Sequence, residues 1–343
     1  MPLPVGAAKV VADNGRVRND GRAEARESAM AVTNLQHFAL AVPDPAVGRE
    51  FYQAAGLDAI ERGNQIAMRC AGRDQDQILL VEGPRRRLHH ISFGTTEEGI
   101  AAVARAAEAA GVARRDAPNE TALDGLWLED PDGILVNVRV AEPAPSRGGP
   151  NALGGQDRWR INTPGHYDRR GARGAIDRRA EVLPRRLGHV LQFTPDPVAK
   201  RDFYTRVLGM KLADHVGDAL AWFYCETPGG SDHHVVAFGK SDGPGFHHAS
   251  FEMATLDHIG VCAQRLLDNG YQDGWGLGRH VIGSNYFHYV RDPWNGLMEF
   301  FADIDFIPEG MKWQPKDWPE QDSLYLWGPE VPDDFIVNFE TAH

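Results

Sequence analysis

Regular alternation of apolar and polar positions starts only after the first 33 residues of the chain. Residues 1–33 show neither the two-residue period of a strand nor the 3.6-residue period of a helix, so we expect a disordered tail there. The apolar run at 187–193 predicts a strand. Asp196 followed by Pro197 is typical of a capped helix start, and Gly209 marks the predicted end of that helix.

Further strands and a longer helix follow in the second half. Residues 256–269 carry apolar side chains at helical spacing and precede Gly270, which predicts a helix that stops there. Short apolar runs between turn residues predict strands at 219–225, 234–238, 248–252, 285–290 and 297–301. This order of elements predicts an α+β module made of two βαβββ units.

The first half of the chain repeats this layout. LQHFALAVPDPAVGREFYQAAGL at 35–57 matches LGHVLQFTPDPVAKRDFYTRVLGM at 187–210. Likewise LHHISF at 88–93 matches FHHASF at 246–251, and LEDPDGILVNV at 128–138 matches VRDPWNGLMEF at 290–300. Self-similarity over such a distance indicates duplication, so we expect an α+β fold of two tandem modules.

Domain boundaries follow from the repeat. We expect an N-terminal module at 34–142 and a C-terminal module at 186–303, joined by a linker at 143–185 that is rich in loop formers and arginine. The last segment, 304–343, is rich in aromatic side chains that would anchor it, so we expect a docked tail or lid. These side chains include Trp313, Trp318, Tyr325 and Trp327.

Composition argues against several classes of function. With 36 Lys and Arg against 48 Asp and Glu, the formal charge of −12 repels a polyanion, so we expect no nucleic-acid partner. We find no run of about 18 apolar residues that would span a membrane and no secretory signal pattern. The three cysteines are few and widely spaced, which argues against a disulfide framework and predicts a reducing, cytoplasmic location.

Three separated residues of the second module, His189, His248 and Glu299, are candidate metal ligands. Each lies in an apolar strand, where an ionised carboxylate is costly unless it is paired or bound to a metal. Two histidines and one carboxylate leave the rest of an octahedral ferrous ion open to substrate and O₂. A lone strand histidine is usually structural, but the joint placement of these three on duplicated strands favours a metal site.

The equivalent residues of the first module are His37, His90 and Asn137. Asn137 replaces the carboxylate that would neutralise a dication, which leaves a poor iron site. We therefore expect the first module to bind no metal.

His247 and His248 are neighbours in a predicted strand, and neighbouring residues of a strand point to opposite faces. Ala249 and Phe251 share the face of His247, and they suit a surface that the following helix covers. We therefore expect His248 to be the ligand and only one of the two histidines to enter the cavity.

The motifs LGHV, HHVVAF, HHASFEM, GRH and YVRDPWNGLMEF, taken together, resemble those of the type I extradiol dioxygenases. These enzymes belong to the vicinal-oxygen-chelate superfamily, which also includes glyoxalases and bleomycin resistance proteins. The resemblance covers 187–303 as a catalytic domain and 35–142 as a metal-free domain. It implies that each module forms a curved, partly closed mixed sheet around a cavity with helices outside. It also implies an Fe(II) cofactor, a small aromatic diol and O₂ as substrates, and a homo-oligomer.

Carried over residue by residue, the resemblance implies a role for six positions. It makes His189, His248 and Glu299 the Fe(II) ligands and His234 the active-site base. It makes His280 and Tyr289 acid/base groups that contact the substrate. A neutral histidine beside the open face of the metal can take a proton from a diol, which agrees with the role implied for His234.

The size of the substrate rests on weaker signals. Trp222 and Phe246 are expected to line a pocket for a fairly large apolar substrate, such as a biphenyl-type diol, although each also suits a core position. The closing segment DSLYLWG resembles the tail of homoprotocatechuate-type enzymes. Both the size and the charge of the substrate therefore stay open at this point.

Two positions depart from the family pattern. His288 stands before Tyr289 where the family usually has an apolar residue, and Asn295 stands in the turn where Gly or Pro is usual. Asn adopts the left-handed backbone conformation at modest cost, so we interpret the second change as turn variation.

Two other functions share this scaffold. A glyoxalase-like isomerase or thiol transferase commonly assembles its metal site across modules or subunits, whereas the ligand set here lies within one module. A non-catalytic binding protein of the bleomycin-resistance type would not require His234, His280 and Tyr289 together.

Overall fold

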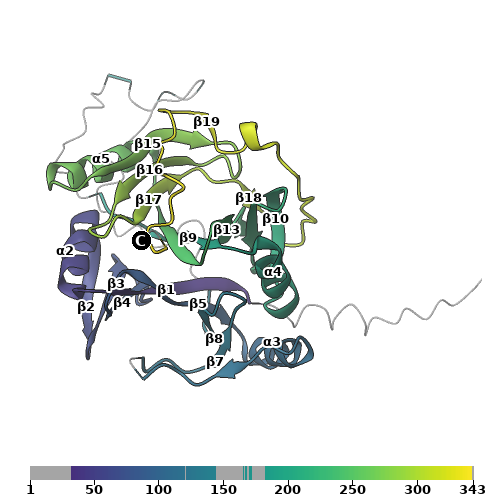
Figure 1. The fold of residues 1–343 in the computed structure, drawn as a ribbon. Coiled ribbons are helices and arrows are strands. Elements are labelled where there is room, and N and C mark those ends of the chain that lie inside the picture. The colour runs from purple at the N-terminus through teal and green to yellow at the C-terminus, as the bar shows by residue number, and fades with distance from the viewer. Residues whose placement is uncertain are drawn as a thin grey trace, which may run out of the picture.

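The computed structural model describes residues 32–119, 121–143, 165, 167, 170–171 and 182–341. Within this range the chain forms two large mixed sheets, one in each half (Figure 1). The expected disordered tail at 1–33 and the expected linker at 143–185 fall almost entirely outside the described residues. No described helix has the length and apolar character needed to cross a membrane.

The first sheet has eight strands in the order β2-β3-β4-β1-β5-β8-β7-β6. Its strands are β1 (Asn34–Val42), β2 (Leu57–Arg62), β3 (Gln65–Cys70), β4 (Ile78–Glu82), β5 (Arg87–Thr95), β6 (Arg114–Arg115), β7 (Leu126–Glu129) and β8 (Leu135–Val140). Its helices are α2 (Pro45–Ala55) and α3 (Glu97–Ala109). The Asp44 side chain caps α2, and Gly56 ends it with a left-handed φ of 102°.

The second sheet has nine strands in the order β10-β11-β13-β9-β14-β17-β16-β15-β19. Its strands are β9 (Arg186–Thr194), β10 (Lys211–Val216), β11 (Leu220–Tyr224), β13 (Val236–Lys240), β14 (Gly245–Glu252), β15 (Asp273–His280), β16 (Tyr286–Arg291), β17 (Leu297–Ala302) and β19 (Tyr325–Trp327). The remaining elements are α4 (Pro197–Asp202), the π-helix η2 (Phe203–Val207), α5 (Leu256–Asp268), the 3₁₀-helix η3 (Glu320–Asp322) and the short pair β12 (Ser231–Asp232) and β18 (Phe306–Ile307).

The two sheets share one pattern of strand pairing. At the centre of the first sheet β1 and β5 are antiparallel, and β4 and β8 run parallel to them on the two sides. In the second sheet β9 and β14 are antiparallel, and β13 and β17 take the same flanking places. The predicted α+β fold with two tandem modules is confirmed. Neither sheet closes into a barrel within the described residues.

Most predicted elements lie within a few residues of the observed ones. The helix expected at 197–209 begins at Pro197 as predicted, but its last turn widens into η2 before Gly209. His234, expected inside a strand, lies just before β13. The pattern missed β15, whose three glycines lower its strand propensity.

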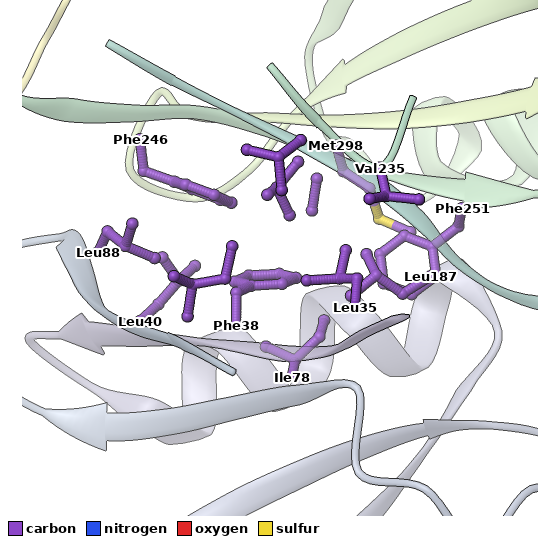
Figure 2. Close-up of a cluster of buried hydrophobic side chains, with 14 of the residues drawn as sticks. Leu35, Phe38, Leu40, Ile78, Leu88, Leu187, Val235, Phe246, Phe251 and Met298 are labelled. Carbon is purple, nitrogen blue, oxygen red and sulfur yellow. The ribbon is translucent and has the colours of Figure 1, made fainter. Parts of the chain in front are cut away.

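One hydrophobic core joins the two modules (Figure 2). The ring of Phe38 on β1 stacks on Phe246 of β14, with 4.9 Å between centroids. Phe51 of α2 meets Tyr271 after α5 edge to face, also at 4.9 Å. Full burial of each such side chain contributes about 1.5–3 kcal/mol. The modules therefore fold against each other as one unit, with α2 beside α5 (Figure 1).

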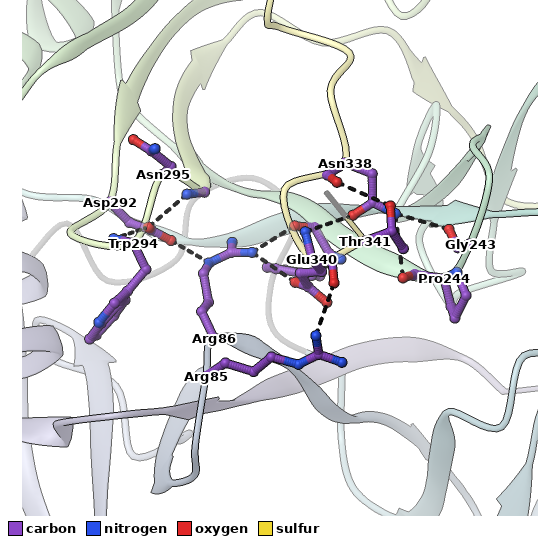
Figure 3. A network of polar contacts seen from close by, with 12 residues as sticks. Arg85, Arg86, Gly243, Pro244, Asp292, Trp294, Asn295, Asn338, Glu340 and Thr341 are labelled. Carbon is purple, nitrogen blue, oxygen red and sulfur yellow. Dashed lines mark hydrogen bonds and ion pairs between the residues drawn. The ribbon is translucent and has the colours of Figure 1, made fainter. Parts of the chain in front are cut away.

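Each module also sends a buried cation to the Asp-Pro turn of the other. Arg86, between β4 and β5, binds Asp292 with 2.7 Å between Nε and Oδ2, and it also binds Glu340 (Figure 3). Lys200 of α4 binds Asp130 in the equivalent turn of the first module. Breaking a buried pair leaves an uncompensated charge, so these contacts fix how the modules meet.

The C-terminal segment, residues 304–341, lies along the second module and ends between the two modules (Figure 1). β18 pairs with β12, and β19 adds to the edge of the large sheet beside β15. The indole N–H of Trp313 donates to the carbonyl of Ala213 at 3.0 Å. These contacts hold the described part of the segment against the second module.

Candidate metal centre and active site

Three neighbouring strands of the second sheet place the candidate ligands in one row. On β14, Ser250 pairs with His189 of β9 on one side and with Glu299 of β17 on the other. Tyr289 of β16 pairs with Glu299 and extends the row. Residues paired across a sheet point to the same face, and His248 lies two positions from Ser250, so it shares that face. Sheet register alone therefore brings these side chains together.

The ligand atoms of His189, His248 and Glu299 all lie within 4.8 Å of one another. Nε2 of His189 is 3.0 Å from Oε2 of Glu299, and Nε2 of His248 is 3.5 Å from the same oxygen. All three side chains are buried, and Glu299 is wholly inaccessible to solvent. The predicted trio is thus assembled around one point.

The environment of Glu299 keeps it ionised. Burial by itself raises the pKa of Glu299, but attraction to His189 and a hydrogen bond from His189 outweigh it and hold the pKa well below the usual range. The amide of Asn285 donates to Oε1 at 3.1 Å, which leaves Oε2 facing the two histidines. The carboxylate is therefore negatively charged and oriented towards His189 and His248.

The residues present fit a metal ion. Nε2 of His248 is buried and has no hydrogen-bond partner among the described residues, and neither has Oγ of Ser250 beside it. Buried polar atoms are normally satisfied. A divalent cation would use the lone pair of His248 and the charge of Glu299, which is the donor set of a two-histidine, one-carboxylate iron site.

His234 stands beside this point, with its ring centroid 4.4 Å from that of His189. Burial first, and then the neighbouring His189, lowers the pKa of His234 well below its usual value, so the ring is neutral. Its Nδ1 lies 3.1 Å from Nδ1 of His233, and Nε2 of His233 lies 3.1 Å from the Asp214 carboxylate. This arrangement leaves the other nitrogen of His234 as a proton acceptor.

His280 and Tyr289 form the opposite side of the site. Nε2 of His280 is 2.9 Å from the hydroxyl of Tyr289, and Nδ1 is 2.7 Å from the carbonyl of Leu324 in the C-terminal segment. Burial, and then the charge of Glu299, raises the pKa of Tyr289 well above its usual value. The tyrosine is therefore a neutral hydroxyl able to donate a hydrogen bond.

A cavity of about 300 Å³ opens onto these groups. His189, His234, His248, His280 and Tyr289 all line it, together with Trp222. Its wall is mainly apolar, and the residues that form the wall include Leu191, Phe193, Leu220, Ala237, Ile282, Leu324, Phe335 and Ile336. The charged residues in the lining, Lys240 and Glu320, are both exposed and carry opposite signs.

Phe246, expected in the substrate pocket, is not brought there. Its ring packs on Phe38 in the shared core, and it lines a neighbouring cavity of about 440 Å³ beside Arg86 and Trp294. The reason lies in the strand: Phe246 precedes an irregularity in β14 and faces the other module.

That irregularity also corrects the parity argument for His247 and His248. The pairing of β14 with β9 skips one residue between Phe246 and His248, so His247 sits in a β-bulge. Both histidines therefore line the cavity, although only one was expected to enter it. Ala249 and Phe251 do face the core, and His248 lies with His189 and Glu299 in the candidate metal site.

The first module keeps the same row without the carboxylate. His37 and His90 meet with 3.0 Å between their Nε2 atoms. Ser92 donates to Oδ1 of Asn137 at 2.7 Å, and the amide nitrogen of Asn137 donates to the carbonyl of Asp124. These polar atoms satisfy one another, in contrast to their counterparts in the second module.

Sequence reasoning missed three groups around the site: Asn285, Ser250 and the pair of His233 with Asp214. Asn285 is buried at the start of β16, and a polar residue just before an apolar strand was its only sequence signal. The unusual left-handed φ of 66° at Asn295 agrees with the turn variation expected there.

Both modules of the chain match a known protein superfamily. Residues 34–138 and 186–300 both match the model of the Glyoxalase/Bleomycin resistance protein/Dioxygenase superfamily, and these two segments coincide with the two modules. The chain belongs to this superfamily.

Two individual relatives indicate the type of enzyme within this superfamily. The chain is 40% identical to metapyrocatechase 2 of Cupriavidus necator over 322 residues, covering 93% of this chain and 96% of the relative. It is 24% identical to the manganese-dependent 2,3-dihydroxybiphenyl 1,2-dioxygenase of Geobacillus genomosp. 3, covering 88% and 95%. Within the superfamily, the chain is a type I extradiol dioxygenase.

Solved structures support the fold. The Mn(II)-bound glyoxalase from Novosphingobium aromaticivorans superposes with a TM-score of 0.68 at 22% identity, covering 91% of this chain and 99% of that one. At this identity the likeness establishes the two-module architecture alone.

Proposed function

We propose that the protein is an Fe(II)-dependent dioxygenase that cleaves the ring of an uncharged, hydrophobic catechol next to its hydroxyl pair, in the degradation of aromatic compounds. His189, His248 and Glu299 hold the metal. The observation that carries the proposal is a single apolar cavity lined by His189, His248, His234, His280 and Tyr289, with the carboxylate of Glu299 within 4.8 Å of the first two.

The bound ferrous ion supplies the redox chemistry that lets O₂ react with a closed-shell diol. The protein supplies proton transfer and orientation. His234 accepts a proton from the diol at Nε2, because its Nδ1 hydrogen points to His233, which in turn donates to Asp214. A neutral histidine is poised for this step at neutral pH.

On the other side of the cavity, a backbone carbonyl sets the direction of the hydrogen bonds. The carbonyl of Leu324 can only accept, so Nδ1 of His280 carries the hydrogen and Nε2 accepts from the hydroxyl of Tyr289. The two side chains are thus placed to hydrogen-bond a substrate oxygen and to return a proton during ring opening.

The lining of the cavity favours a substrate without charge. Burying a carboxylate costs several kcal/mol unless a cation meets it. The one lysine of the lining, Lys240, is exposed and is offset by Glu320. A volume of about 300 Å³, with Trp222 and Ala237 on adjacent strands at one wall, accommodates a ring substituent. We therefore propose alkyl- or aryl-substituted catechols, including biphenyl-type diols.

One experiment tests these points together. The protein is reconstituted anaerobically with ferrous or manganous ion, and O₂ uptake is followed with catechol, 2,3-dihydroxybiphenyl and 3,4-dihydroxyphenylacetate. We expect the iron enzyme to consume O₂ with the two uncharged diols and to form a yellow product, with much slower uptake on the acid. Higher turnover with manganese would reject Fe(II) as the cofactor. Faster turnover of 3,4-dihydroxyphenylacetate would reject the proposed preference for uncharged diols. Isomerisation of a hemithioacetal without O₂ uptake would reject the reaction.

Two further aspects belong to this proposal. Cys70, Cys225 and Cys262 are all buried and unpaired, which supports a reducing, cytoplasmic location. Assembly into a homo-oligomer stays a prediction, and light scattering after size exclusion measures it directly.

A further inference from the structure

Adjacent histidines occur three times in the described chain, and each pair makes the same contact. Nδ1 of one ring meets Nδ1 of the next at 2.8 Å for His89 and His90, at 3.1 Å for His233 and His234, and at 2.6 Å for His247 and His248. The first pair lies in the module without a carboxylate ligand, so the contact alone does not indicate a metal. In the second module the far end of each outer ring has its own partner, which is Asp214 for His233 and Phe335 for His247.

The far end of His247 meets the C-terminal segment. Its Nε2 lies 2.7 Å from the backbone carbonyl of Phe335, 88 residues along the chain. A carbonyl only accepts hydrogen bonds, so this nitrogen carries the hydrogen. A neutral imidazole has one N–H, and Nδ1 of His247 is therefore the acceptor in its contact with His248.

The direction of these hydrogen bonds also determines which nitrogen of His248 carries its hydrogen. The hydrogen shared by the two rings is on Nδ1 of His248, which leaves Nε2 of His248 with a free lone pair. That same Nε2 is buried without a hydrogen-bond partner among the described residues, and it lies 3.5 Å from Oε2 of Glu299. The ring is thus prepared for metal binding before any ion arrives.

We propose that His247 is a positioning residue that fixes the tautomer and ring orientation of the ligand His248, using the carbonyl of Phe335 as its anchor. The inference rests on the proposed metal centre. It implies that the C-terminal segment, besides lining the cavity, contributes to metal affinity.

Phe335 is well held for this purpose. Its ring contacts those of His247, Tyr289 and Trp275 at centroid distances of 4.8, 5.0 and 4.7 Å. The preceding residue, Asp334, binds Arg291 at 2.7 Å. The anchor carbonyl is therefore fixed by packing and by an ion pair on the second sheet.

The bulge in β14 makes this arrangement possible. In a regular strand His247 would point away from the face of His248. The extra residue turns both rings to the same side, where a hydrogen bond between them forms.

The test measures the affinity of the apoprotein for ferrous ion by anaerobic competition with a chelator, which needs no turnover. Partners of metal-bound histidines typically contribute 10- to 100-fold in affinity, so His247→Leu should weaken binding by about that factor. His247→Asn keeps an acceptor near Nδ1 and should recover most of the affinity. His89→Leu, the matched change in the first module, should leave affinity unchanged.

Each of the following results supports or overturns the proposed role of His247. Affinity of His247→Leu within about twofold of wild type, in a folded protein by circular dichroism, overturns the proposal. Equal loss in His247→Leu and His247→Asn overturns the hydrogen-bond order. If the leucine variant does not fold, ¹⁵N spectra of histidine-labelled apoprotein decide instead: we expect His248 as the Nδ1–H tautomer and His247 as the Nε2–H tautomer, and the reverse assignment rejects the proposal.

Failure of the underlying metal centre is distinguishable from failure of this inference. Glu299→Ala serves as the reference that removes a ligand. If wild type and Glu299→Ala bind ferrous ion equally, the metal centre itself is wrong. If only Glu299→Ala loses the ion while His247→Leu keeps it, the centre stands and the role of His247 does not.

Discussion

Nε of Arg86 in the first module lies 2.7 Å from Oδ2 of Asp292 in the second module. This ion pair holds a turn of the second module in place. The other oxygen of Asp292 accepts the backbone N–H groups of Trp294 and Gly296, which shapes the turn just before β17 (Figure 3). Glu299 stands on that strand. The first module therefore supports the position of Glu299, which we propose as a metal ligand of the second module.

Arg86→Met should lower the free energy of unfolding by about 3–5 kcal/mol, because Asp292 and Glu340 would keep buried charges without their cation. Urea denaturation of the metal-free protein measures this. Arg49→Ala is the control: Arg49 pairs with Glu61 on the surface, where such pairs contribute less than about 1 kcal/mol. Similar small losses in both variants would contradict the interpretation of Arg86.

Metal content should be one ion per chain. The reconstituted protein is analysed by mass spectrometry of the metal after desalting. Glu299→Gln should hold almost none, because the neutral amide no longer balances a dication. His37→Gln, at the equivalent row of the first module, should retain one. Two ions per wild-type chain would show that the first module also binds metal.

Tyr289→Phe should reduce kcat by about 100-fold or more while leaving the metal content unchanged, since general acid–base groups typically contribute 10²–10⁴-fold. Tyr286→Phe, on the same strand, is the matched control because its ring packs on Arg279 and Trp327 outside the cavity. Steady-state O₂ uptake compares the two. Equal kcat in the two variants would remove Tyr289 from the proposed mechanism.

Ala237→Leu should discriminate substrates by size. Ala237 lines the cavity next to Trp222, its partner in the register of β13 and β11, so added methyl groups fill the space for a ring substituent. One extra methylene in a pocket changes specificity by about 10- to 200-fold. We expect kcat/KM for 2,3-dihydroxybiphenyl to fall at least tenfold relative to catechol. A parallel loss for both diols would mean that the substituent lies elsewhere.

Much of the fold could be predicted because the signals are local and repeated. The capped start at Pro197, the helix at 256–268 and the duplicated strands each follow from spacing within a short window. The proximity of His189, His248 and Glu299 could be predicted because they occupy equivalent strands of a repeated pattern. The family resemblance is confirmed, and the roles that it implies for His234, His280 and Tyr289 stay predictions.

What the sequence did not reveal depends on long-range or irregular geometry. A β-bulge at His247 shifts parity by one residue, and nothing in FHHASF marks it. The contact between His247 and Phe335 joins segments far apart in the chain. Phe246 was expected in the substrate pocket, although its sequence position also suited the core. Only the packing of its ring on Phe38 of the other module shows that it belongs to the core.

The amide at Asn137 limits how this scaffold can be re-engineered. Exchanging it for aspartate would restore the missing charge, but the hydroxyl of Ser92 and the carbonyl of Asp124 already occupy its two ends. The new carboxylate would face the oxygen of Asp124 where an N–H now donates, and the two would repel. Building a second catalytic centre in the first module thus demands a redesigned loop as well as a new ligand.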